Sequence, residues 1–350
     1  MAHLDQPPGG RRYRAPRDEA APETYPIDPP APQYRYGDGL SQYALYDSRD
    51  DGRVADSHPR TEDEPVSRPR TGRRRAHAKP GGRAGRNLPA AIGVGVGLGG
   101  AVLASLFLWT PAFFAVVLLA VAIGIWEMVR AVAERARPPL IPLLAGGLVM
   151  VGLAWYGGAD ALALGLLSTL LAVFVWRLGD GAVNYQRDVT VAALIAVYVP
   201  FLGSFAVLLA TPSDGNLRVL ATLLAVVLSD TGGYVSGVFL GRHPMAPSVS
   251  PAKSWEGFVG SLVWAAVGSA IALPLVLDHA VWWHGVIFGL AVSMASVLGD
   301  LAESLIKRDL GIKDMSSLLP GHGGLMDRLD SILLAAPTGY AVLTFLVPPG

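Results

Sequence analysis

The stretch Leu88–Trp126, LPAAIGVGVGLGGAVLASLFLWTPAFFAVVLLAVAIGIW, decides the fold, because it runs for 39 residues without a charged side chain. As one helix it would be about 58 Å long at ~1.5 Å per residue, roughly twice the ~30 Å hydrocarbon core of a bilayer. We therefore predict two membrane spans. They separate at Trp109-Thr110-Pro111, where an interfacial aromatic precedes a proline suited to a helix start.

Further apolar runs of spanning length follow as far as the C-terminus, with short polar segments between them. We place them at about Leu140–Tyr156, Ala161–Trp176, Val189–Ala210, Leu217–Leu240, Phe258–Leu277, Val281–Gly299 and Ser331–Val347. Together with the first two, they predict an all-α, polytopic integral membrane protein with about nine transmembrane helices.

The zero net charge of the chain averages two unlike parts. Residues 1–86 are rich in charged residues, Pro, Gly and Tyr, and such a segment buries too little apolar surface to offset its chain entropy. We predict a disordered cytoplasmic tail over 1–86 and a transmembrane domain over 87–350. From Arg68 to Arg86 there are eight basic residues and no acidic one, the pattern that is retained on the cytoplasmic side.

The loops support this orientation. Eleven of the twelve Lys and Arg residues after residue 87 fall on the side of the tail, and the exception is Arg218. The eleven are Arg130, Arg135, Arg137, Arg177, Arg187, Arg242, Lys253, Lys307, Arg308, Lys313 and Arg328. The charged loops Gly241–Gly257 and Leu305–Asp330 are therefore expected on the cytoplasmic face.

Gly299–Ser331, GDLAESLIKRDLGIKDMSSLLPGHGGLMDRLDS, concentrates charge between the last two spans. Its first part places Asp300, Glu303, Ser304 and Lys307 on one helical face. Carboxylates there suit a hard cation such as Mg²⁺, and Lys307 with Arg308 suits phosphate oxygens. A plain salt bridge within the helix explains Glu303 and Lys307 about equally well.

The second part of this stretch, PGHGGLMDRLDS, has paired glycines that let the backbone turn tightly or approach an anion. Asp327, Arg328 and Asp330 then open the last membrane helix. Asp330 has an alternative interpretation as the N-cap of this helix. Asp327 is not needed for that cap. A metal shared by Asp300 and Asp327 would join the last two spans.

SDTGGYVSGVFLG, Ser229 to Gly241, carries Asp230 inside an apolar span. A lone carboxylate there costs about 2.5–3.5 kcal/mol on insertion scales, so Asp230 is expected to face a polar cavity. The glycines of this motif are also explained by close helix packing.

SVSPAKSWEGFVG, Ser248 to Gly260, places Lys253 and Ser254 before a helix start at Trp255-Glu256. A cation, a hydroxyl and a helix N-terminus together suit a phosphate. The alternative is a lysine that only sets the membrane orientation.

The long charged stretch resembles the signature of the phosphatidate cytidylyltransferases, the CDP-diacylglycerol synthases. The residues that carry the resemblance are Ser304, Lys307, Arg308, Lys313, Asp314, Pro320, His322, Gly323, Gly324, Asp327, Arg328 and Asp330. SDTGGY and SPAKSWEG resemble two other blocks of that family, and the likeness covers roughly residues 90–347. Ala252 stands where the family usually has Lys, and Gly233 where it usually has Ala, so the Lys253 loop has one lysine where the family usually has two.

The resemblance implies a plasma-membrane enzyme, often dimeric, that condenses CTP with phosphatidate to CDP-diacylglycerol and pyrophosphate. Mg²⁺ is the implied cofactor, and a second, monovalent cation is a further candidate. No nucleic acid partner is expected. The implied catalytic residues are Asp300, Asp327, Lys253, Lys307, Arg308 and Arg328. The implied substrate-binding residues are Ser304, Lys313, His322, Gly323, Gly324, Asp230, Tyr234, Ser254 and Glu256. Asp300 and Asp327 are the implied metal ligands, with Asp230 as a further candidate.

Such a reaction needs no nucleophile from the protein. A phosphatidate oxygen, already charged at neutral pH, would attack the α-phosphorus of CTP and expel pyrophosphate. The protein then has to overcome the repulsion between two polyanions.

Two other function classes fit part of the pattern. A CTP-dependent lipid kinase would release CDP instead of pyrophosphate. An anion transporter would show internal repeats with broken helices, and the sequence shows none.

Overall fold

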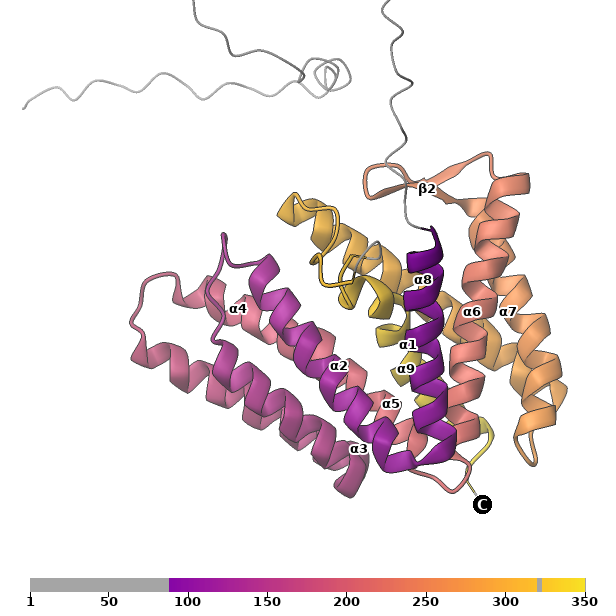
Figure 1. The fold of residues 1–350 in the computed structure, drawn as a ribbon, viewed down its shortest axis with the longest axis horizontal. Helices are drawn as coiled ribbons and strands as arrows, with labels where there is room; N and C mark the ends of the chain where they lie inside the picture. Colours follow the sequence, from indigo (N-terminus) through magenta and orange to yellow (C-terminus); the bar gives the residue numbers. More distant parts are fainter. Residues whose placement is uncertain (1–87, 320–322, 350) are drawn as a thin grey trace, which may run out of the picture. The chain divides into compact units, whose positions relative to one another are not determined.

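Helices account for most of residues 88–319 and 323–349, the part of the chain that the computed structural model describes. They are α1 (Leu88–Leu108), α2 (Thr110–Ala131), α3 (Leu140–Gly179), α4 (Tyr185–Ala196), α5 (Leu202–Ala210), α6 (Gly215–Leu240), α7 (Trp255–Val276), α8 (Trp282–Leu310) and α9 (Met326–Leu346) (Figure 1). A π-helical turn, Val197–Phe201, joins α4 to α5. Strands β1 (Pro244–Ala246) and β2 (Ser250–Ser254) form an antiparallel hairpin before α7. The all-α prediction is confirmed, whereas the predicted tail lies outside the described residues.

The predicted count of about nine spans is not confirmed. Within the described residues, seven helices are long and apolar enough to cross a membrane: α2, α3, the continuous helix Tyr185–Ala210, and α6 to α9. The apolar helix Gly95–Leu108, within α1, is shorter than these seven. The predicted break between α1 and α2 is confirmed, with Trp109 extended at φ −163° and Pro111 in the first turn of α2.

The region predicted as two spans, residues 140–156 and 161–176, consists of two helical arms of α3, which meet at the non-helical residue Gly158, at φ 72° and ψ −163°. A Cβ on Gly146 would collide with the side chain of Thr169. In a straight helix these residues would be about 35 Å apart at ~1.5 Å per residue. The helix therefore doubles back at Gly158, a conformation open to glycine because it has no Cβ.

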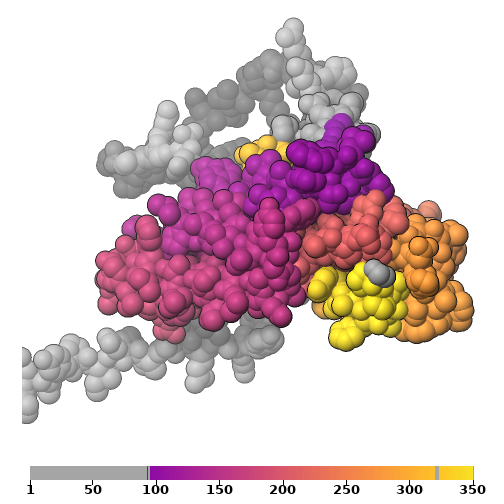
Figure 2. Space-filling view, turned by 90° about the horizontal axis from the view of Figure 1, so that it is seen from below, coloured from indigo at the N-terminus to yellow at the C-terminus, as the bar shows by residue number. Residues whose placement is uncertain are grey.

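Helices α6 to α9 pack in sequence order, each against the next, and α5 joins them to α2, α3 and α4 through its contact with α9 (Figure 1). Figure 2 shows these two groups side by side, in magenta and in salmon to yellow. Glycines allow the α6–α7 contact, since a Cβ on Gly260 would collide with Ser236 and one on Gly232 with Trp264. Close packing of small residues is a general means of helix association in membranes.

Arg218, the one basic residue on the predicted outer side, has a structural role. Its side chain is 3% exposed, and its Nε lies 2.7 Å from Asp214 Oδ1. Its Nη2 donates to the carbonyl of Val347, beyond the end of α9, at 2.8 Å. Because its charge is paired and its donors are used inside the fold, Arg218 does not contradict the predicted orientation.

The ends of α8 and α9 place the charged stretch. Helix α8 continues beyond Gly299 to Leu310, which agrees with the prediction that Asp300 and Lys307 lie on one face of a helix. Gly311, in the left-handed conformation at φ 73°, ends it. Helix α9 begins at Met326, five residues before the predicted span. Asp330 therefore lies in the second turn of α9, and its interpretation as a helix cap is wrong.

Candidate active site

A polar cavity of about 550 Å³ opens where α6, α7, α8, α9 and the β-hairpin meet. It brings together residues from all the motifs that the sequence singled out. Its charged and aromatic lining consists of Asp230, Tyr234, Lys253, Phe258, Asp300, Lys307, Asp314, Asp327, Arg328 and Asp330. Four separate stretches of sequence thus converge on one site that can bind both a cation and polyanions.

Lys253 and Asp300 form the first ion pair of the cavity. The Nζ of Lys253, on β2, lies 2.6 Å from Asp300 Oδ2 on α8. The hydroxyl of Ser304, one turn further along α8, donates to Asp300 Oδ1 at 3.4 Å. Arg308 holds the hairpin to α8, because its Nε donates to the carbonyl of Val249 at 3.2 Å. The hairpin therefore positions Lys253 over the cavity.

The base of the hairpin is fixed by two side chains predicted to bind substrate. Ser254 is the N-cap of α7 and accepts a hydrogen bond from the amide of Gly257 at 3.1 Å, which confirms the predicted helix start. Glu256 accepts from the backbone amides of Arg242 and His243, at 3.1 and 3.2 Å. Glu256 is outside the cavity lining, whereas Ser254 is part of it.

Lys307 links two carboxylates. Its Nζ lies 3.2 Å from Glu303 Oε1 and 2.9 Å from Asp327 Oδ1. The Glu303 side chain is 0% exposed, so Lys307 is the cationic partner of a carboxyl group that has no access to water. The salt bridge within the helix is present, but Lys307 also joins α8 to α9 across the site.

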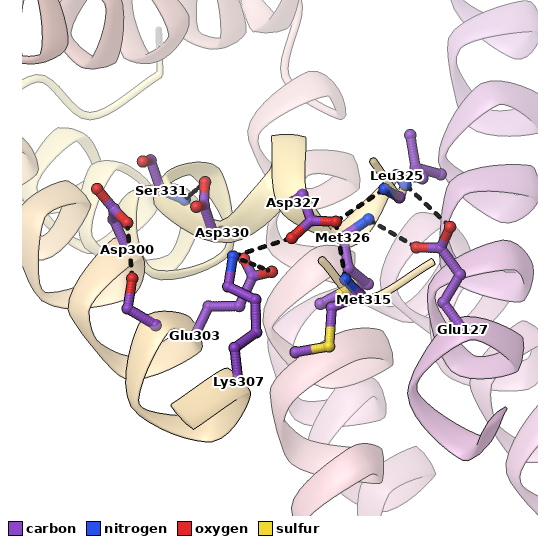
Figure 3. Close-up of polar contacts among 12 residues, drawn as sticks. Glu127, Asp300, Glu303, Lys307, Met315, Leu325, Met326, Asp327, Asp330 and Ser331 are labelled. Atoms are coloured by element: carbon purple, nitrogen blue, oxygen red, sulfur yellow. Dashed lines mark hydrogen bonds and ion pairs between the residues drawn. The ribbon is translucent and has the colours of Figure 1, made fainter. Parts of the chain in front are cut away.

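Asp327 holds the paired-glycine turn. Its Oδ2 accepts from the amides of Gly324 and Met315, at 2.7 and 2.9 Å (Figure 3). Gly323 has φ 77°, and a Cβ there would lie 2.8 Å from Asp327 Oδ2, so both conformation and space require glycine. His322 lies outside the described residues.

The remaining predicted residues divide by position. Asp230 lines the cavity and is exposed to it, as expected for a carboxylate in an apolar span. Tyr234 and Arg328 also line it. Arg308 and Lys313 do not, and Lys313 is exposed on the surface. Asp330 belongs to the charged motif but was not among the predicted site residues, and in the structure it lines the cavity.

The sequence interpretation missed Glu127, near the end of α2. Its carboxylate is fully buried, yet it accepts hydrogen bonds from the amides of Leu325 and Met326, at 2.9 and 2.8 Å, and from the Ser316 hydroxyl at 2.6 Å (Figure 3). The available signal was one carboxylate directly after the long uncharged stretch.

The lining has carboxylates of the kind that Mg²⁺ uses as ligands. Asp300 and Asp327 each pair with a lysine ammonium, at 2.6 and 2.9 Å, and a metal ion bound there would replace or share that cation. Among the described residues, no three acidic or histidine side chains form a metal-binding group by themselves. Mg²⁺ does not need one, because it keeps several waters and is usually bound by one or two carboxylates with substrate phosphates.

Comparisons with known proteins agree with this chemistry. Residues 89–346 match the model of the cytidylyltransferase family. A phosphatidate cytidylyltransferase of Mycobacterium leprae is 43% identical over 283 residues, which cover 75% of this chain and 90% of that protein. One from Mycobacterium tuberculosis H37Rv is 40% identical over 316 residues, covering 85% and 96%. One from Haemophilus influenzae is 36% identical over 267 residues, covering 68% and 92%.

Proposed function

The chain belongs to the cytidylyltransferase family, and we propose that its polar cavity condenses CTP with phosphatidate to CDP-diacylglycerol and pyrophosphate. The observation that carries this proposal is the convergence of Asp300, Asp327, Lys253 and Lys307 on one cavity. The resemblance seen in the sequence is confirmed by the family match. The lipid-kinase and transporter alternatives gain no support from these relatives.

Within this reaction, the cations of the cavity bind the phosphates. Lys253, Lys307 and Arg328 line the cavity and would pair with the oxygens of CTP and phosphatidate, which reduces the repulsion between the two anions. Asp300 and Asp327 would hold Mg²⁺, which, when bound, neutralises phosphate charge and stabilises the pyrophosphate leaving group. The Gly323-Gly324 turn and Tyr234 would shape the pocket around the nucleotide.

The covalent step requires no residue as nucleophile. An oxygen of the phosphatidate phosphate forms a bond to the α-phosphorus of CTP, and the bond from that phosphorus to the bridging oxygen of pyrophosphate breaks. The electron pair leaves with the pyrophosphate. The role of the protein is then to orient the two phosphates in line, as in other phosphoryl-group transfers.

The products decide between the candidate reactions. Membranes containing the chain, incubated with labelled CTP and phosphatidate, should form CDP-diacylglycerol and one pyrophosphate per lipid product. Removal of Mg²⁺ with a chelator should stop the reaction, and omission of phosphatidate is the control. Release of CDP with a phosphorylated lipid would instead identify a kinase and contradict the proposal.

The chain is a multi-pass membrane protein, and we propose that it lies in the plasma membrane with the cavity on the cytoplasmic face. The support is the distribution of Lys and Arg over the loops. A homodimer remains a prediction from the resemblance.

Single cysteines can test the orientation, because the chain has none of its own. Asp160 follows the turn at Gly158, Glu134 follows α2, and both side chains are exposed. We expect a membrane-impermeant maleimide to label Asp160→Cys in intact cells, and Glu134→Cys only after permeabilisation. Labelling of both from the same side would show that the first arm of α3 does not cross the membrane.

A further inference from the structure

Glu127 and Asp327 hold the same short segment from opposite sides. Figure 3 shows the backbone of Leu325 and Met326 between the two carboxylates. Glu127 accepts from the amides of Leu325 and Met326, whereas Asp327 accepts from the amides of Gly324 and Met315. Four backbone donors at and before the start of α9 are thereby bound by two side chains from different helices.

The contact leaves little freedom at Gly324. A Cβ on this residue would lie 2.8 Å from Glu127 Oε2 and 2.9 Å from Oε1, so the backbone packs directly on the carboxylate. The same carboxylate binds the Ser316 hydroxyl at 2.6 Å, and Ser316 directly follows Met315, whose amide binds Asp327. Glu127 therefore binds the segment between α8 and α9 at two points, at Ser316 and at the start of α9.

A buried carboxylate is costly unless its oxygens are fully hydrogen-bonded. The three donors on Glu127 meet that requirement, and the positive end of the α9 dipole adds to it. The arrangement satisfies the amide of Met326, the first residue of α9, and that of the N-cap residue Leu325, which provides no side-chain cap. The first turn of α9 also carries Asp327 and Arg328, which line the cavity.

We propose that Glu127 is a positioning residue for the cytidylyl transfer: it sets the place of Asp327, and through Asp327 that of Lys307. This inference rests on the proposed function. Without Glu127 the start of α9 loses its attachment to α2, and the carboxylate that pairs with Lys307 at 2.9 Å moves with it. A displacement of about 1 Å at a reacting centre can lower a rate by about 100-fold.

The test compares Glu127→Gln with two other variants in the full-length chain. The glutamine keeps the size of the side chain but presents an N–H₂ group toward one of the donors that the carboxylate binds. Ser316→Ala removes the shortest of the three hydrogen bonds on Glu127, together with the one that the Ser316 hydroxyl accepts from the Leu318 amide at 3.1 Å. Glu134→Gln is the matched control, because Glu134 is exposed near the same end of α2 and outside the cavity lining.

For Glu127→Gln we expect kcat to fall by about 10- to 100-fold. The KM for CTP should change by no more than about threefold, because Lys253 on the hairpin keeps its place and Lys307, although displaced, is still present. Ser316→Ala should lower kcat by a smaller factor, and Glu134→Gln should leave it unchanged. Amide hydrogen exchange in Glu127→Gln should rise in peptides from residues 312–319 and 323–330, and not in peptides from α7.

Full kcat in folded Glu127→Gln would overturn the proposal. So would a loss of activity that only follows the loss of folded protein, with faster exchange in every helix. If Glu127→Gln does not fold, Ser316→Ala decides: a lowered kcat with local exchange supports the proposal, and an unchanged kcat overturns it. If the unaltered chain makes no CDP-diacylglycerol, the proposed function fails, and the exchange pattern alone tests the role of Glu127.

Discussion

Replacement of Asp300 by Asn is expected to lower the turnover of CTP by about 100- to 1,000-fold, the range seen when one charge-stabilising group is removed from an active site. The Asp300 side chain is 37% exposed within the cavity wall, so its loss should leave folding and membrane insertion nearly unchanged. The substitution removes the partner of Lys253 and one of the two proposed ligands of Mg²⁺. The defect should therefore lie in catalysis.

The measurement is CDP-diacylglycerol formation at a series of Mg²⁺ concentrations. Asp300→Asn should need more Mg²⁺ for half-maximal rate and should stay slow at saturation. Asp309→Asn is the matched control, because Asp309 lies on the same helix, is 77% exposed and pairs with Arg135 at the surface at 3.4 Å. Normal turnover by Asp300→Asn at low Mg²⁺ would exclude Asp300 as a ligand.

Replacement of Lys307 by Met is expected to abolish activity and also to destabilise the fold. Lys307 is the shared partner of Glu303 and Asp327, at 3.2 and 2.9 Å. The Glu303 side chain is 0% exposed, and removal of one partner of a buried ion pair costs about 3–5 kcal/mol. Thermal unfolding in detergent and CTP turnover should therefore both change.

A second substitution separates the two effects. Glu303→Gln in the Lys307→Met background removes the buried carboxyl group that lost its partner, so the midpoint of unfolding should recover in part. Activity should not recover, because the phosphates and Asp327 still lack the ammonium group. If the double variant regains both stability and turnover, Lys307 has only a structural role in this protein.

The sequence alone predicted the helical membrane fold, the break at Trp109 and the start of α7, and these predictions are confirmed. It also predicted that Asp230 faces a polar cavity. These features follow from local rules. The thickness of a bilayer fixes how many apolar residues a helix needs to cross it, and a charge within such an apolar run needs a polar environment.

The sequence could also predict that the motifs meet in one site, because charged side chains at the ends of neighbouring spans avoid the hydrocarbon core and gather in the same polar region. It could not predict which charged residues pair with each other. Asp300 with Lys253, and Lys307 with both Glu303 and Asp327, are choices among several possible pairs of opposite charge. Which pair forms depends on the packing of α8 against the hairpin and α9.

By itself, the sequence determined which apolar runs are long enough to cross a membrane, and it carried the family signature. It also predicted the side of the membrane on which the charged loops lie. Only the tertiary structure showed that Gly158 makes the turn between the two spans predicted in this region, and that Glu127 binds the start of α9. The partners of Glu127 are mainly backbone amides 198 and 199 residues away, and a backbone amide leaves no mark in the sequence. Such a contact exists only after packing has brought α2 and α9 together.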